Sequence, residues 1–86
     1  MKELLTETIE HAALYNKIYN DDSITVTLRK YYDSYEVVYE TPERYYVLGQ
    51  DCEWCFEHAF NVYNEYVAEA KKNAADIAEA KKIPNR

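Results

Sequence analysis

Two cysteines three positions apart are the residues of this 86-residue chain whose spacing most suggests chemistry. The stretch "CEWC" at 52–55 opens an expected helix, and a helix N-terminus favours a thiolate, which would make Cys52 the more reactive thiol. Thioredoxin-like folds surround this motif with βαβ units, which no pattern here predicts. The plainer interpretation places both cysteines as small apolar residues on a buried face. A zinc site of Cys52, Cys55 and His58, with His11 as fourth ligand, is the other alternative.

No other motif indicates a reaction. The chain has one glycine and therefore no Gly-rich phosphate loop, and no nucleophile stands at a recognisable spacing from a histidine. We therefore expect a non-enzymatic protein with no cofactor and no metal.

The densest pattern is "YYDSYEVVYETPERYYV" at 31–47, which holds six tyrosines and four acids, with Arg44 as its single base. Tyrosine is enriched at interfaces because it buries a large area with few rotors and keeps a polar tip. Adjacent strand residues point to opposite faces, so one residue of the Tyr31–Tyr32 pair and one of the Tyr45–Tyr46 pair should be exposed. The stretch therefore favours a contact surface.

The charge of the chain indicates which class of partner it binds. Residues 31–70 carry nine acids and one base, and the whole chain has a net charge of −6. Direct nucleic-acid binding needs clustered Lys and Arg, whereas an acidic surface attracts basic proteins. We expect a basic partner, such as a nuclease or effector, and no nucleic acid or membrane. The expected contact residues are Tyr32, Asp33, Glu36, Val38, Glu40, Glu43, Tyr46, Asp51, Glu53 and Glu57.

The elements that would position this surface form an α+β fold in a single domain, 1–86. Leu5, Ile9 and Ala12 recur at helical spacing and predict a helix at 2–20. Alternating residues in "SITVTLRK", "YEVVYET" and "RYYVL" predict a three-stranded antiparallel meander at 24–48, with Glu36, Val38 and Glu40 on its solvent face and Arg29 and Arg44 able to pair across strands. A second helix is expected at 52–82, continuous or broken near 72–73, with both helices on one sheet face.

Six tyrosines are expected to build the core of this small domain, because the chain is short of Leu and Ile: Tyr15, Tyr19, Tyr35, Tyr39, Tyr63 and Tyr66. No apolar run approaches the roughly 18 residues that span a bilayer, and no signal peptide is evident, so we expect a cytoplasmic protein. The repeated "AEAKK" at 68–72 and 78–82 leaves open a monomer or a weak homodimer.

The expected order of elements matches the double-stranded RNA-binding domain, but Asp51, Glu53 and Glu57 stand where that family places its basic cluster, so the chemistry is reversed. With "SITVTLRKYYDSYEVVYETPERYYVLGQ" and the helices around it, the chain resembles the small acidic phage-encoded anti-CRISPR inhibitors. That resemblance rests on architecture and charge and carries over no functional residue. It implies an inhibitor that occupies the nucleic-acid groove of a nuclease, in the cytoplasm of the host cell. The alternatives are a toxin-neutralising immunity protein and a structural module that self-associates through residues 68–82.

Overall fold

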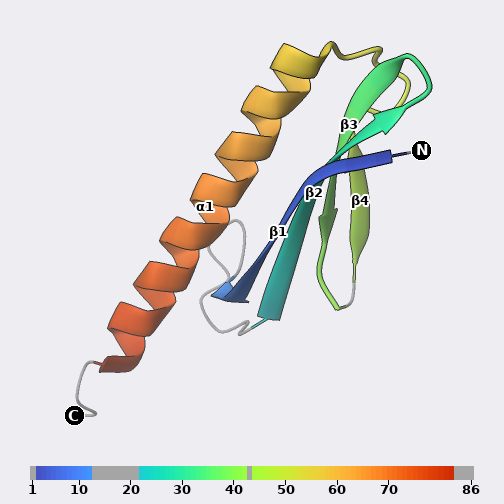
Figure 1. Cartoon of the computed structure of the whole chain (residues 1–86). Helices are drawn as coiled ribbons and strands as arrows, with labels where there is room; N and C mark the ends of the chain where they lie inside the picture. The colour runs from blue at the N-terminus through green and yellow to red at the C-terminus, as the bar shows by residue number, and fades with distance from the viewer. Residues whose placement is uncertain (1, 13–21, 43, 83–86) are drawn as a thin grey trace.

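A four-stranded antiparallel sheet with one long helix across a single face forms the fold (Figure 1). This computed structural model describes residues 2–12, 22–42 and 44–82. The strands lie in chain order, β1 (Lys2–Ala12), β2 (Asp22–Tyr31), β3 (Ser34–Glu40) and β4 (Tyr45–Leu48), and α1 (Phe56–Lys82) follows them. The helix packs over β1, β2 and β3 and leaves β4 uncovered.

The expected N-terminal helix at 2–20 is wrong, because residues 2–12 form β1; residues 13–21 lie outside the described part of the chain. The apolar residues of this segment fit both the helical and the strand period. Leu5 and Ile9 are four positions apart, as on one face of a helix, but they also share one face of a strand whose other face carries threonines. Thr6 and Thr8 face away from the helix and pair through their hydroxyl oxygens with Thr27 and Thr25, at 2.9 and 3.0 Å. Pairing with β2 favours the strand, because the ten-residue β2 then has a hydrogen-bonded neighbour on both of its edges.

This correction changes the fold class from three strands between two helices to four strands and one helix. The predicted meander at 24–48 is present as β2, β3 and β4, and β1 adds the fourth strand. The order of elements therefore no longer matches the double-stranded RNA-binding domain. It also differs from the architecture on which the likeness to anti-CRISPR inhibitors rested.

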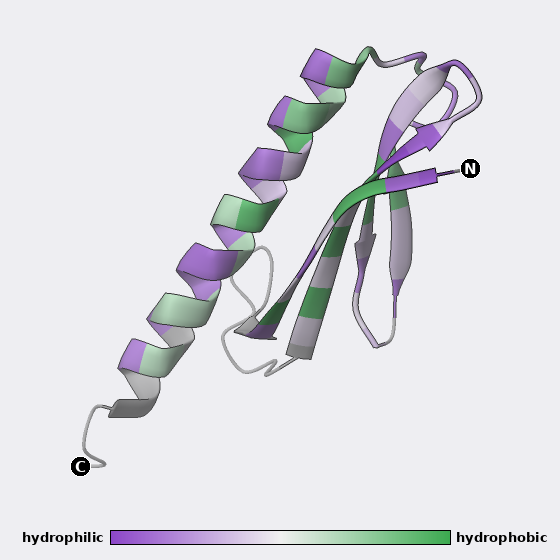
Figure 2. Ribbon diagram, in the orientation of Figure 1, coloured by the Kyte–Doolittle hydropathy of each residue, from purple (hydrophilic) through white to green (hydrophobic). Residues whose placement is uncertain are grey.

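The core lies between the helix and the sheet face that alternation predicts. Along β2 apolar and polar residues alternate (Figure 2), and Ile24, Val26 and Leu28 are at most 1% exposed. The tyrosines expected in the core, Tyr35, Tyr39, Tyr63 and Tyr66, all belong to it or pack against it, whereas Tyr15 and Tyr19 lie outside the described residues. Small side chains at Ala59 and Ala70, both fully buried, let the helix approach the sheet closely.

The helix is continuous and begins later than the expected residue 52. Positive φ angles at Asp51 (61°) and Glu53 (52°) hold the chain in a turn, which the N–H of Cys52 closes by donating to the carbonyl of Gly49 at 3.0 Å. Gly49 itself has a φ of 85° and lies against the ring of Trp54, where a Cβ would clash. No break occurs near 72–73, and the C-terminal part of α1 extends beyond the sheet (Figure 1).

Candidate partner-binding surface

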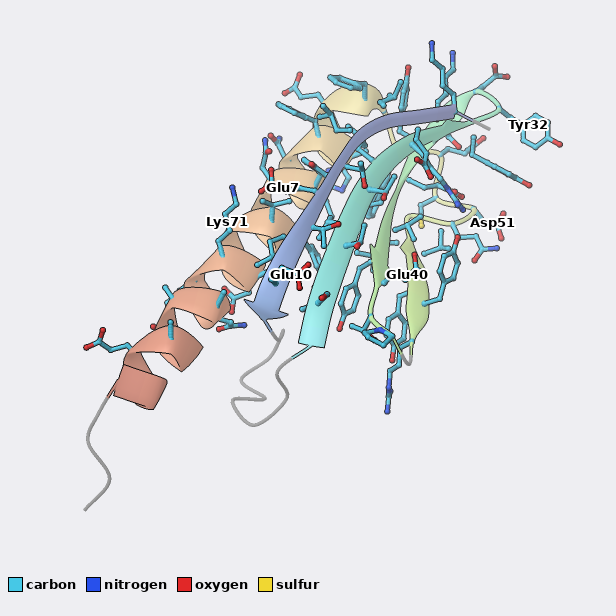
Figure 3. All side chains as sticks on the ribbon, turned by 60° about the horizontal axis from the view of Figure 1, so that its bottom comes forward. Glu7, Glu10, Tyr32, Glu40, Asp51 and Lys71 are labelled. Atoms are coloured by element: carbon cyan, nitrogen blue, oxygen red, sulfur yellow. The ribbon has the colours of Figure 1, made fainter. Side chains whose placement is uncertain are left out.

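One end of the molecule gathers the β2–β3 hairpin, the turn after β4 and the first turn of α1. The hairpin has a two-residue loop, Tyr32–Asp33, since Tyr31 and Ser34 pair. The N–H of Tyr35 donates to the carbonyl of Trp54 at 3.1 Å and holds the 49–55 turn beside the hairpin. We call five of the exposed residues of these segments the hairpin end: Tyr32, Asp33, Asp51, Glu53 and Glu57. Tyr32 and Asp51 point outward on the same side (Figure 3).

The backbone of the hairpin end is strained. Within the described ranges, the non-glycine residues with a positive φ are Tyr32 (55°), Asp51 (61°) and Glu53 (52°), and all three belong to this end. L-residues avoid the left-handed region, and such strain concentrates at functional sites. Tyr32 is the extreme case, because the residue is 81% exposed, and its ring meets that of Tyr31 edge-on, at 4.6 Å between ring centroids.

The charge of the hairpin end is predominantly negative and open to solvent. Neither a hydrogen bond nor an ion pair from the described side chains holds the carboxylates of Asp33, Asp51, Glu53 or Glu57. Two lysines share this end of the sheet at paired positions, Lys2 on β1 and Lys30 on β2. The ammonium of Lys30 lies 6.0 Å from the centre of the Tyr35 ring. Among the described residues, the four carboxylates of the hairpin end therefore outnumber these two lysines.

Glu36 and Val38 correct the expected surface, because both are buried, with 3% and 5% exposure. Glu36 accepts hydrogen bonds from Arg29, whose Nε and Nη2 both lie 2.8 Å from its Oε1, so the predicted cross-strand pairing of Arg29 is confirmed. The Nη1 of Arg29 also donates to the hydroxyl of Tyr45 at 3.1 Å. Burial alone would lower the pKa of Arg29, but the bonds to Glu36 and Tyr45 outweigh it and raise that pKa.

Tyr45 explains why an open sheet face is buried at these positions. In the register, Tyr45 pairs with Glu40, which lies four residues along β3 from Glu36 and two from Val38. Its ring must cross the Val38 position to reach Arg29, and it therefore shields both Val38 and Glu36 from water. Sequence reasoning missed this role of Tyr45, although its alternation with Val47 places it on that face.

The remaining expected contact residues divide between two places. Glu40 is exposed on the Tyr45 face. Tyr46 is 40% exposed on the opposite face, where its ring stacks on Tyr39 at 5.3 Å between centroids and its hydroxyl accepts from Arg44 at 2.8 Å. Glu43 lies outside the described residues.

The cysteines do not lie on a buried face as expected. Both Cys52 and Cys55 are free and exposed, and the sulfur of Cys55 accepts the N–H of His58 at 3.5 Å as a cap of α1. Among the described residues, no three His, Cys, Asp or Glu side chains are grouped to hold a metal ion; the side chain of His11 lies outside them.

Comparison with protein-family models, curated proteins and solved structures found no significant match. Within the described ranges, no helix has the length and apolar character needed to cross a membrane. The function must therefore be argued from the surface of this chain itself.

Proposed function

We propose that this chain is a non-enzymatic inhibitor that binds a basic nucleic-acid-binding protein through the hairpin end. The observation that carries the proposal is Tyr32, a strained and 81% exposed aromatic residue at the same end of the molecule as four carboxylates that no described side chain pairs with. A ring that contributes so little to the fold, held where the backbone is costly, is explained by a contact outside the chain.

The chemistry of such a contact follows from the residue types. The Tyr32 ring offers apolar area and a hydroxyl, and the carboxylates at the same end of the molecule can pair with the Arg and Lys side chains that line a nucleic-acid groove. Occupying that groove would exclude the nucleic acid without any covalent step. Action on a CRISPR nuclease in the cytoplasm of a phage-infected cell is the narrower form of this proposal.

A charge reversal with a matched control tests the location of the contact. Asp33→Lys/Glu53→Lys reverses two acids of the hairpin end, and Glu69→Lys/Asp76→Lys reverses two exposed acids of α1 with the same change in net charge. The wild-type chain is used to capture partners from a nuclease-treated lysate, and each captured protein is identified and purified. Its dissociation constant is then measured with all three chains at low and high salt, with and without nucleic acid.

We expect the hairpin-end variant to bind at least about tenfold more weakly, since each desolvated charge pair contributes about 1.5 kcal/mol or more. The α1 variant should bind like the wild type, and nucleic acid should compete. Equal weakening by both variants would reduce the effect to net charge, and equal binding by all three would remove the hairpin end as the contact. Capture of a single toxin, with no competition by nucleic acid, would instead assign the chain to the immunity proteins.

A further inference from the structure

The two edges of the sheet differ in how they are protected. β1 lies beneath the helix, its pairing with β2 shifts register at Glu3/Leu5 and Ile9/Ala12, and it carries acids along its length. β4 pairs with β3 in an unbroken register, lies outside the cover of α1, and presents Tyr45 and Tyr46 at 57% and 40% exposure. An uncovered edge strand is a template for pairing with another chain, and the brevity of β4 limits how strong that pairing can be.

The hydrogen-bond pattern identifies which residues of β4 face outward. The N–H of Thr41 donates to the carbonyl of Arg44 at 2.9 Å, so these two residues form a hydrogen-bonded pair. Such pairs alternate along an antiparallel ladder, and Tyr46 and Leu48 therefore direct their backbone groups toward β3. Tyr45 and Val47 direct their N–H and carbonyl groups to the open edge. The bond from Tyr35 to Trp54 fits the same alternation on β3.

We infer that β4 pairs with β4 of a second copy of this chain, antiparallel and about a two-fold axis. Charge complementarity favours this occupant: Arg44 directly precedes β4 and Asp51 lies three residues after it, so an antiparallel copy places Arg44 of one copy in the same half of the contact as Asp51 of the other. A parallel arrangement would place like charges together.

The tyrosines fit the same arrangement. If Tyr45 of one copy exchanges backbone bonds with Val47 of the other, Tyr46 lies directly opposite Tyr46 of the second copy, as a non-hydrogen-bonded pair with close side chains. Tyr46 already stacks on Tyr39 with an angle of 13° between ring planes, and Tyr39 lies 6.1 Å from Tyr66 between ring centroids. The pairing would extend this row of rings across the axis and join two four-stranded sheets into one.

The dimer must be weak, because four-residue strands bury little area, and interfaces below about 1,200 Å² in total are typical of weak or transient complexes. Sedimentation velocity of the full chain over about a hundredfold range of concentration, up to about 1 mM, therefore tests it. Val47→Pro removes an outward N–H and keeps the ladder to β3, while Val47→Ala removes side-chain contacts and keeps the N–H. The comparison of these two variants isolates the backbone bond.

We expect the wild type to dimerise and Val47→Pro to dimerise about 30-fold more weakly than Val47→Ala. Each hydrogen bond from the N–H of Val47 strengthens the dimer about fivefold, and the two-fold axis gives the dimer two such bonds. Amide exchange measured on the wild type should show that the N–H groups of Tyr45 and Val47 become protected as concentration rises. A wild-type monomer throughout, or equal dimerisation of the two variants, overturns the inference. Dimerisation without protection at Tyr45 and Val47 also overturns it and moves the contact to α1.

Discussion

Tyr32→Asn separates the cost of Tyr32 to the fold from its contribution to binding. A left-handed conformation costs most L-residues about 1–2 kcal/mol, and asparagine tolerates it well. The substitution also removes the edge-on contact with Tyr31, which is worth about 0.5–1.5 kcal/mol. These two changes oppose each other, so we expect the free energy of unfolding to stay within about 1 kcal/mol of the wild type.

Urea unfolding followed by the fluorescence of Trp54 measures this change. A chain of this size has a denaturant slope of about 1 kcal/mol per molar urea, so the midpoint should move by less than about 1 M. Tyr39→Asn is the matched control, because Tyr39 packs against the core and stacks on Tyr46; its loss should cost about 3 kcal/mol. A loss above about 2 kcal/mol for Tyr32→Asn would refute the reasoning, since the ring would then be part of the fold. Unchanged affinity for the captured partner would remove Tyr32 from the contact.

Two further predictions concern the buried polar groups. Glu36→Ala leaves the largely buried guanidinium of Arg29 without its carboxylate and should lower the free energy of unfolding in urea by about 2–3 kcal/mol. Glu40 is exposed, so Glu40→Ala should lower it by less than about 0.5 kcal/mol. Equal losses would contradict the shielding of Glu36 by Tyr45. Burial, assisted by the nearby carboxylate of Glu7, raises the pKa of Tyr63 above its ordinary value near 10. The raised pKa gives a stabilisation that is complete below about pH 10 and is lost as pH rises through the folded-state pKa. The wild type should therefore lose more stability than Tyr63→Phe as pH rises above about 10, and parallel curves would contradict a raised pKa.

The sequence predicted the central part of the fold because alternation in β2 and β3 has one physical interpretation. Ile24, Val26 and Leu28 are buried on one face, as expected. Residues 2–12 were misread because Leu5 and Ile9 satisfy both the helical and the strand period, and the choice depends on a partner strand some 20 residues away. The threonines at 6 and 8, which are β-branched, were the available signal.

The candidate surface was only partly predictable for two separate reasons. The burial of Glu36 depends on a ring from β4 that reaches Arg29 across Val38, and no local pattern encodes that reach. The left-handed backbone at Tyr32 falls on a residue type that does not favour it, so turn preferences give no warning. The acids of the hairpin end were predicted because charge remains visible in the sequence however the chain folds.

The two proposed surfaces constrain each other through the direction of β4. β4 runs into the 49–55 turn, so an antiparallel pair of β4 strands places the two hairpin ends at opposite ends of the dimer. Asp51 would then lie toward the contact between the two β4 strands, while the other residues of the hairpin end stay accessible to a partner on each copy: Tyr32, Asp33, Glu53 and Glu57. Such a dimer is bivalent, and a partner immobilised at high density would be held more tightly by avidity without any new contact. Val47→Pro should therefore weaken binding to a dense surface and leave binding to a single partner molecule unchanged, whereas Asp33→Lys/Glu53→Lys should weaken both.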